Sequence, residues 1–364
     1  MKKIAVVVTA RASWAKLQPV CEALRGRCEL QIIACASALL ERYGRVVDVI
    51  RAQGFEIGAE CWTVHEGDTL LTSAKETGAL LVDLSGHLSR LHPDTVLCCA
   101  DRHEVLGAAQ AASYLHLSLA HLQGGESSGS IDDKVRNAVT MLADVHFTAT
   151  KRAADNVARM IGTYAAVEPV GCPSIQMALR AQHEPTVTEQ ELGGAGAEID
   201  LSEPFGIVLQ HPVTSEAEQS GEQMAMTLKA LTCTQWIVFW PGEDAGAGAM
   251  SKAIRQSQAH SDWFHTVRNL PPSRFLRLLT QASVLIGNSS AGIRECSALG
   301  VPVVDIGSRQ HGRERGPNVI DCQHHAEQIA AAIRQQVAHG TYEPSSLYGS
   351  GDAGAKIAEI LCRE

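Results

Sequence analysis

The sequence predicts an α/β fold of two doubly wound domains whose parallel sheets face a central cleft. The length of 364 residues suits two domains of ordinary size. Short apolar runs alternate with longer segments of helical period, which is typical of parallel strands joined by crossover helices. Glycine, serine and charged residues follow the expected strands, at the sheet edge where such folds bind ligands.

The first domain is expected to span residues 1–182. Its strands are predicted from continuous apolar runs at residues 4–9, 30–34, 95–99, 118–121 and 146–148. Helical period separates these runs at residues 14–24, 37–53, 73–91, 104–114 and 134–143. This alternation indicates a parallel sheet whose crossover helices cover it.

The second domain, residues 202–350, repeats the rhythm. Its strands are predicted at residues 205–209, 236–240, 283–286 and 302–304. Its helices are predicted at residues 216–231, 250–259, 274–281 and 291–299. Residues 183–201 mix proline, glycine, threonine and acidic side chains, which is typical of a connection. A last helix within residues 351–364 is expected, and the sequence leaves open whether it packs on the second domain or back on the first.

Composition excludes several classes of function. The 31 basic and 40 acidic residues give a net charge of −9, which offers no basic footprint for nucleic acid. No C-x-x-C occurs among the 11 cysteines, so no metal site is expected and a reducing cytoplasm is indicated. No apolar run reaches the roughly 18 residues of a membrane span, and the apolar start is too short for a signal peptide.

A serine loop follows one strand of the second half. Residues 286–295 read Ile-Gly-Asn-Ser-Ser-Ala-Gly-Ile-Arg-Glu, so a helix is expected to begin at Ser289 and Ser290. Backbone N–H groups at a helix N-terminus suit a diphosphate, and Glu295 lies near enough to accept from ribose hydroxyls. Arg309, after the next strand, can add positive charge. A plain serine N-cap and a solvated basic loop are the alternatives.

Charged residues also follow strands of the first half. Arg11 follows the first strand, where the absence of G-x-G-x-x-G disfavours a dinucleotide cofactor. Asp101 and Arg102 belong to a run of four ionisable residues that suits acid–base chemistry. The alternative is a helix start with Asp101 as its N-cap.

Two further candidates lie after strands. Asp132 and Arg136 follow a glycine- and serine-rich loop and, four residues apart, would share a helix face. His211 precedes Pro212, which biases it away from a helix and into a loop. A surface ion pair and a lone non-catalytic histidine are the alternatives.

In chain order the motifs are A-D-R-H-E, Q-G-G-E-S-S-G-S-I-D-D-K-V-R, G-C-P-S, Q-H-P-V-T, D-A-G, G-N-S-S-A-G-I-R-E and D-I-G-S-R-Q-x-G-R-E. Together they resemble the UDP-N-acetylglucosamine 2-epimerase family, and within it the hydrolysing branch of the sialic-acid pathway. The resemblance implies two Rossmann-like domains of the GT-B type with a UDP-sugar bound between them. It also implies a homo-oligomer, dimer or tetramer, and chemistry without metal or nicotinamide cofactor.

The implied reaction is an elimination of UDP to a 2-acetamidoglycal, then hydration to N-acetylmannosamine. By the same resemblance, the residues assigned to catalysis are Asp101, Glu126, Asp132, Arg136 and His211. The residues assigned to UDP-sugar binding are Arg11, Arg102, Gln123, Ser289, Ser290, Glu295 and Arg309.

Two positions depart from the family pattern. Gln123 stands where many relatives have a glutamate, and an amide cannot act as a base, so either Glu126, Asp132 or Asp101 takes that role or the substrate differs. The family's Thr-Gly-Thr-Arg is Val-Thr-Ala-Arg here, ending at Arg11. The remaining alternatives are the same chemistry on a UDP-2,4-diacetamido-trideoxy sugar, a GT-B glycosyltransferase, and a non-catalytic UDP-sugar-binding protein. The pair His103-Glu104 has no role in any of them.

Overall fold

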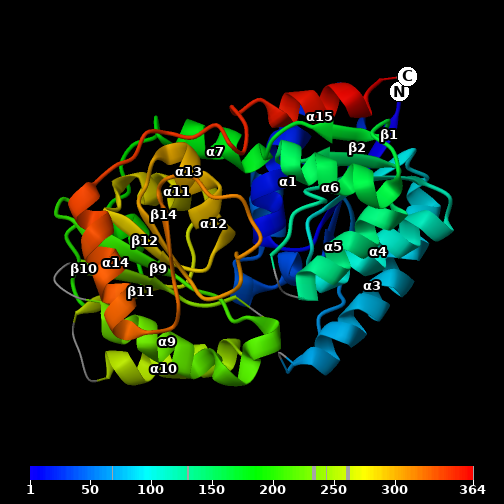
Figure 1. The fold of residues 1–364 in the computed structure, drawn as a ribbon. Helices are drawn as coiled ribbons and strands as arrows, with labels where there is room; N and C mark the ends of the chain where they lie inside the picture. The colour runs from blue at the N-terminus through cyan, green and yellow to red at the C-terminus, as the bar shows by residue number, and fades with distance from the viewer. Residues whose placement is uncertain (68, 129–130, 232–234, 243, 260–262, 364) are drawn as a thin grey trace. The chain divides into compact units, whose positions relative to one another are not determined.

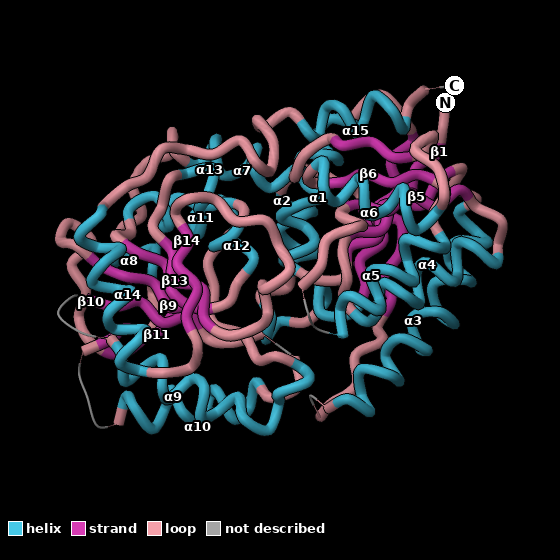
Figure 2. The backbone as a smooth tube through the Cα atoms, in the orientation of Figure 1, coloured by secondary structure: helices cyan, strands magenta, loops and turns pink. Residues whose placement is uncertain are grey.

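The computed structural model describes residues 1–67, 69–128, 131–231, 235–242, 244–259 and 263–363 (Figure 1). They group into two compact units. The first unit comprises Met1–Glu126, Ile131–Met177 and Tyr348–Glu364, and the second comprises Ser127–Ser130 and Ala178–Leu347. Each unit holds one twisted, mainly parallel sheet with helices packed against it (Figure 2).

The sheet of the first unit has seven strands in the order β3-β2-β1-β4-β5-β6-β7, and neighbouring strands pair in parallel. The strands are β1 (Lys3–Val8), β2 (Glu29–Cys35), β3 (Ile57–Cys61), β4 (Thr95–Cys99), β5 (Ser118–Leu122), β6 (Val145–Thr148) and β7 (Val167–Pro169). The order reverses beside β1, which places the turns after β1 and β4 at the switch point where doubly wound sheets bind ligands.

Helices connect these strands. They are α1 (Arg11–Leu24), α2 (Val46–Ala52), α3 (Leu70–Leu91), α4 (His103–Tyr114), α5 (Ile131–Leu142), α6 (Lys151–Ile161) and α15 (Ala353–Leu361). Because β1 is apolar on both faces, its alternate side chains enter two cores. Val6 packs with Trp14 of α1 and Ile357 of α15, whereas Val7 packs in the core that holds Leu84 of α3.

The C-terminal helix α15 belongs to the first unit and packs against α1. The two helices approach closely at Gly354, where a Cβ atom would lie 2.6 Å from the carbonyl oxygen of Pro19. Lys2 and Arg363 are hydrogen-bonded, so the two ends of the chain meet in this unit (Figure 1). Only glycine, which has no side chain, permits the close approach of the backbone at position 354 to that of Pro19.

The sheet of the second unit has the order β14-β13-β12-β9-β10-β11-β8. Its strands are β8 (Ala195–Gly196), β9 (Phe205–Leu209), β10 (Gln235–Phe239), β11 (Phe264–Val267), β12 (Val284–Gly287), β13 (Val303–Ile306) and β14 (Val319–Cys322). Edge strand β8 runs antiparallel to β11, and the other neighbours pair in parallel. The segment expected to be a plain connection thus contributes a strand to this sheet.

The helices of the region from residue 173 to 339 are α7 (Pro173–Ala181), α8 (Glu189–Leu192), α9 (Ser220–Ala230), α10 (Ala247–Gln258), α11 (Pro272–Gln281), α12 (Ser290–Ile293), α13 (Glu295–Leu299) and α14 (Ala326–His339). The core of the second unit collects Val208 and Ile286 from the sheet with Met224, Met250 and Ile333 from α9, α10 and α14. None of the described helices is long and apolar enough to span a membrane.

Three predicted helices are shorter or broken. The segment 37–53 forms two 3₁₀ turns and then α2. Gly44, with a left-handed φ of 83°, ends the second 3₁₀ turn and separates it from α2. The segment 216–231 is helical as α9 from Ser220, after a 3₁₀ stretch, Thr214–Gln219. The segment 291–299 divides into α12 and α13 at Arg294, whose φ and ψ are −100° and −70°.

Candidate functional site

The first unit gathers seven of the predicted residues after strands β1, β4 and β5. Arg11 is the first residue of α1, Asp101 and Arg102 lie between β4 and α4, and Gln123 and Glu126 follow β5. The remaining two, Asp132 and Arg136, lie on α5. Since the carboxyl ends of parallel strands share one edge of a sheet, this edge is the candidate site of the first unit.

Arg136 is almost fully buried, with 1% of its surface exposed. It forms ion pairs with Asp101 and Asp133, and its Nη1 atom donates to the carbonyl oxygen of Glu126 at 2.8 Å. Burial by itself would lower the pKa of Arg136, but Asp101, Glu126 and Asp133 raise it overall. The guanidinium therefore stays charged and fixes the direction of the Asp101 carboxylate.

Gln123, at the position where many relatives have a glutamate, is fixed by its surroundings. It is 1% exposed and adopts a left-handed φ of 71°. Its Nε2 atom donates to Sγ of Cys172 at 2.9 Å, and that sulfur lies 2.9 Å from Oγ of Ser174. Oε1 of Gln123 has no hydrogen-bond partner among the described residues. A buried acceptor without a donor is suited to a ligand N–H or O–H group.

A neutral histidine supports the turns of this edge. His121, in β5, is fully buried, and its ring nitrogens lie 3.0 Å from the carbonyl oxygen of Ala100 and 3.2 Å from Oγ1 of Thr140. Burial lowers the pKa of His121 to about 4. Its uncharged ring therefore ties the turn that precedes Asp101 to α5.

Arg11 carries a charge that its surroundings do not neutralise. Burial lowers its pKa to about 10, and its Nη1 atom has no hydrogen-bond partner within the described ranges. It lies at the N-terminus of α1, whose first turn has no acidic residue. A cation at the positive end of a helix is unfavourable, so an anionic ligand would stabilise this arrangement.

Residues 102–104 join a network that sequence reasoning missed. Nε of Arg102 donates to Glu104 at 2.7 Å, and Glu104 also faces the ring of His103 at 3.2 Å. The other ring nitrogen of His103 lies 2.8 Å from Glu76 of α3. Glu76 precedes His103 by 27 residues, so no local pattern marks the pair.

The second unit places Ser289 and Ser290 directly after β12. Gly287 permits the turn, because its φ is 132° and a Cβ atom would lie 2.2 Å from the carbonyl oxygen of Leu209. Ser289 is the N-cap of α12, and its hydroxyl accepts from the N–H of Ala291 at 3.3 Å. Since α12 has four residues, a helix dipole contributes less here than the sequence predicts, and hydroxyl and backbone donors remain for an anion.

Asn288, which sequence reasoning also missed, holds His211 in place. Its Oδ1 atom accepts from the N–H of His211 at 2.7 Å, and its Nδ2 atom donates to the carbonyl oxygen of His211 at 2.8 Å. The carbonyl oxygen of Asn288 in turn accepts from Gln310 at 2.7 Å and from Arg309 at 3.4 Å. Through its side-chain amide and its backbone carbonyl, Asn288 thus connects the loops that carry His211, the serines and Arg309.

Glu295, the first residue of α13, completes the predicted set of the second unit. It is 8% exposed, and its Oε2 atom has no hydrogen-bond partner in the part of the chain that the structure describes. A buried carboxylate oxygen of this kind is an acceptor for hydroxyl groups of a ligand.

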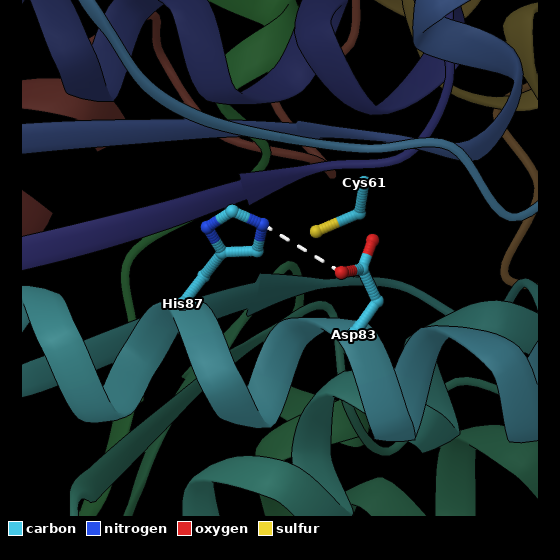
Figure 3. Close-up of side chains that lie close together, drawn as sticks. All are labelled: Cys61, Asp83 and His87. Carbon is cyan, nitrogen blue, oxygen red and sulfur yellow. Dashed lines mark ion pairs between the residues drawn. The ribbon is translucent and has the colours of Figure 1, made fainter.

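A separate group of side chains offers sulfur, oxygen and nitrogen atoms in the first unit. Cys61 of β3 faces Asp83 and His87 of α3, with the three candidate ligand atoms within 4.8 Å of one another (Figure 3). Nη2 of Arg90 lies 3.0 Å from Nδ1 of His87. Because a guanidinium can only donate, Nδ1 accepts and Nε2 carries the proton toward Asp83.

Two doubly wound sheets in one chain, with polar residues after their strands, define an α/β protein of the GT-B-like class. A family model described as UDP-N-acetylglucosamine 2-epimerase matches residues 22–362. The chain therefore belongs to the UDP-N-acetylglucosamine 2-epimerase family.

Curated relatives span almost the whole chain. It is 28% identical over 373 residues to the UDP-N-acetylglucosamine 2-epimerase of Neisseria meningitidis serogroup B, covering 99% of this chain and 95% of that protein. It is also 28% identical over 366 residues to the UDP-N,N'-diacetylbacillosamine 2-epimerase (hydrolyzing) of Legionella pneumophila, covering 99% and 96%.

Solved structures share the fold. The Neisseria meningitidis UDP-GlcNAc 2-epimerase bound to UDP-GlcNAc superposes with a TM-score of 0.82 at 15% identity over 100% of both chains. The Methanocaldococcus jannaschii UDP-GlcNAc 2-epimerase in complex with UDP-GlcNAc and UDP gives 0.79 at 16% identity over 99% of both chains.

Proposed function

We propose that the chain hydrolyses UDP-N-acetylglucosamine to UDP and N-acetylmannosamine, which supplies a sialic-acid type of sugar synthesis. The observation that carries the proposal is the Asp101 carboxylate held by buried Arg136 at the switch point of the first sheet. An oriented, ionised carboxylate is what proton transfer at C2 of the sugar requires. The similarity to UDP-sugar 2-epimerases of Neisseria meningitidis and Legionella pneumophila supports the substrate class.

The reaction divides into two steps. A carboxylate takes the proton from C2 while the C1–O bond breaks, so the electron pair of the C2–H bond forms the C1–C2 double bond and UDP leaves. Water then adds a hydroxyl group at C1 and a proton returns to C2 from the opposite face, which releases N-acetylmannosamine. The difficult part is the first step, because the C2 proton is not acidic and the departing diphosphate must be stabilised.

Leaving-group stabilisation is assigned to the cationic and donor groups of both units. Arg11 and Arg102 serve the diphosphate from the first unit, and Ser289, Ser290 and Arg309 serve the nucleotide from the second. Glu295, with its unpartnered buried oxygen, accepts from the ribose hydroxyls.

The base is assigned among the remaining carboxylates. Gln123 cannot take a proton from carbon, so Asp101, Glu126 or Asp132 does, with Asp101 favoured because Arg136 orients it. Gln123 instead offers Oε1 to an N–H or O–H group of the sugar. His211, whose backbone Asn288 fixes, is assigned to proton transfer.

A second candidate is the same chemistry on a UDP-2,4-diacetamido-trideoxy sugar. The relatives from Legionella pneumophila and Campylobacter jejuni, 28% and 26% identical, carry hydrolysing diacetylbacillosamine epimerase names. Such a sugar adds an acetamido group at C4, which a pocket must accommodate.

One experiment separates these possibilities. The protein is incubated in D2O with UDP-N-acetylglucosamine or UDP-N,N'-diacetylbacillosamine, without an acceptor, and followed by phosphorus and proton NMR. Release of UDP together with a free sugar deuterated at C2 is the expected result. UDP-N-acetylmannosamine without UDP release would overturn hydrolysis, and an intact, undeuterated substrate would support a binding protein or a transferase that needs an acceptor.

We also propose that the enzyme works in the cytoplasm as a homo-oligomer, a dimer or a tetramer. The ten cysteines that the structure describes are free thiols, as a reducing compartment requires. Light scattering after size-exclusion chromatography measures the assembly.

A further inference from the structure

Four ionisable side chains of the first unit form one continuous network, which we call the His103 network: Glu76, Arg102, His103 and Glu104. His103 lies at its centre, with Nε2 at 2.8 Å from Glu76 and Nδ1 at 3.2 Å from Glu104. Glu104 then accepts from Nε of Arg102 at 2.7 Å. Both ring nitrogens of His103 therefore lie near carboxylates, an arrangement that favours a protonated imidazole. The Nε2 contact with Glu76 is a hydrogen bond, whereas the Nδ1 contact with Glu104 is an ion pair without hydrogen-bond geometry.

Burial makes the charges of this network interdependent. The side chain of Glu104 is 1% exposed and that of Glu76 is 12% exposed. A carboxylate so far from water must be paired with a cation to stay ionised. Glu104 has two such cations, Arg102 and His103, and it divides its negative charge between them.

The direction of each pKa agrees with this charge pattern. Burial raises the pKa of Glu104, but Arg102 and His103 lower it more, and the pKa lies below its ordinary value. Burial lowers the pKa of His103, but Glu104 and Glu76 raise it more, against the opposing charge of Arg102. The network then holds two positive and two negative charges.

Further contacts of the network among the described residues involve uncharged groups. Cys35 of β2 faces Glu104, and burial raises the pKa of its thiol well above the ordinary value, so it stays neutral. The hydroxyl of Thr77 donates to the carbonyl oxygen of His103 at 3.1 Å, and Glu76 accepts from the backbone N–H of His65 at 2.9 Å. Of the four side chains of the network, the imidazole of His103 is the one whose charge changes nearest to neutral pH.

Loss of the His103 proton would leave Arg102 as the sole cation of the network opposite two carboxylates. Glu104 would then be neutralised by Arg102 alone, which draws the guanidinium charge toward the protein. While His103 is protonated, Glu104 is shared, and more of the positive potential of Arg102 is available to a ligand.

We propose that Glu76, His103 and Glu104 are positioning residues that hold Arg102 for an anionic ligand, and that a proton on His103 strengthens diphosphate binding by Arg102. The proposal rests on the proposed function, which assigns Arg102 to the UDP-sugar. It adds a pH-dependent control of nucleotide affinity, carried by residues that do not touch the ligand.

Thermodynamic reciprocity makes the coupling measurable from both sides. If protonation of His103 increases the affinity for UDP, then bound UDP must raise the pKa of His103 by the same factor. A rise of one pKa unit on binding corresponds to about a tenfold change in affinity.

The first measurement is a pH titration of the histidine ring resonances by NMR, with His103 assigned from the His103→Gln spectrum. We expect its pKa to lie above the ordinary 6.5 in the free protein. Saturating UDP is expected to raise it further by about half to one unit. Glu76→Gln should lower the pKa of His103, and this variant leaves the more buried Glu104 intact.

The second measurement is calorimetric binding of UDP from pH 6 to pH 9 by the natural chain and by His103→Gln. UDP has its own ionisation near pH 6, but this is common to both proteins and cancels in their affinity ratio. We expect the natural chain to bind UDP about threefold to tenfold more tightly than His103→Gln at low pH. At high pH the two proteins should bind UDP equally. His183→Gln, an exposed position outside the network, is the matched control and should follow the natural chain.

The outcomes separate this inference from the proposed function. A constant affinity ratio across the titration of His103, or a His103 pKa that UDP does not move, overturns the coupling while nucleotide binding stands. A His103 pKa at or below its ordinary value overturns the charge pattern of the network. Failure to bind UDP at any pH overturns the proposed function itself.

Discussion

Nε2 of Gln123, in the turn after β5, donates a hydrogen bond to Sγ of Cys172, which follows β7 and lies 2.9 Å away. The bond fixes the amide so that Oε1 remains an acceptor without a donor among the described residues. The chain thus keeps a directed polar group at this position, but one that cannot remove a proton from carbon. The role of this position is open to a direct test.

Gln123→Glu should increase the turnover of the UDP-sugar by about tenfold or more, because it adds a candidate general base. Burial would raise the pKa of the new carboxyl group, so the gain should appear as the pH rises through that pKa. Steady-state kcat measured against pH checks this, with Gln123→Asn as the control that keeps an amide. An unchanged or lower kcat in the glutamate variant would show that the base acts from elsewhere.

Asp101→Asn should lower kcat by about a hundredfold or more, because the oriented carboxylate is lost. The affinity for UDP should change by less than about threefold. Asp133→Asn is the matched control, since it also removes a carboxylate partner of Arg136. Kinetics and UDP calorimetry on both variants distinguish the roles, and equal losses in the two would mark Asp101 as a partner of Arg136 alone.

Gly125→Ala and Gly162→Ala compare two glycines with φ of 77° and 76°. At Gly162 a Cβ atom meets nothing within 4 Å, whereas at Gly125 it would lie 2.1 Å from the carbonyl oxygen of Ala153. We expect Gly162→Ala to cost about 1 kcal/mol in unfolding free energy from backbone strain. Gly125→Ala should cost about 3 kcal/mol, with loss of UDP binding, because α6 and the Gln123 turn must separate.

Denaturant unfolding of the two glycine variants measures the difference. Similar costs in both would mean that the turn after β5 moves freely from α6.

Asp305 should make the second unit less stable as the pH rises. Burial raises its pKa to about 7, Arg315 opposes this, and Asp321 adds to it. Because the pKa in the folded state exceeds the ordinary 3.8, the fold favours the protonated form. The stabilisation is complete below about pH 4 and is lost as the pH rises through about 7.

Between pH 5 and pH 8 the natural chain should lose about 2 kcal/mol more unfolding free energy than Asp305→Asn. Asp321→Asn should reduce the loss, because it removes the like charge beside Asp305. Unfolding curves of the three proteins at several pH values supply the test, and parallel pH dependences in all three would contradict it.

Central strands were predictable because they are apolar on both faces, as in β4, where every residue is buried. Strands β3, β7, β8, β11 and β14 escaped prediction because they lie at or next to sheet edges, and they are short or mix polar with apolar residues. In β14 the sequence Val-Ile-Asp-Cys is partly exposed throughout. Edge strands bury less surface, so their pattern resembles that of a loop.

The candidate residues that follow strands were predictable because a strand, a turn and a polar motif are adjacent in the sequence. Their supporting residues were not. Asn288 holds His211 from 77 residues away, and Glu76 holds His103 from 27 residues away. Such pairs depend on which strands become neighbours, and periodicity within one segment carries no signal for that.

The packing of α15 on α1 determines the order in which the protein can mature. The first unit receives its final helix from the segment after Leu347, so the second unit is inserted within it. During translation the ribosome makes α1 and the first sheet early, but the surface beside Pro19 that Gly354 will cover stays exposed until the whole second unit has been made. A nascent chain truncated before Tyr348 would expose the apolar surface of α1 that α15 normally covers, and chaperones and proteases could act on it.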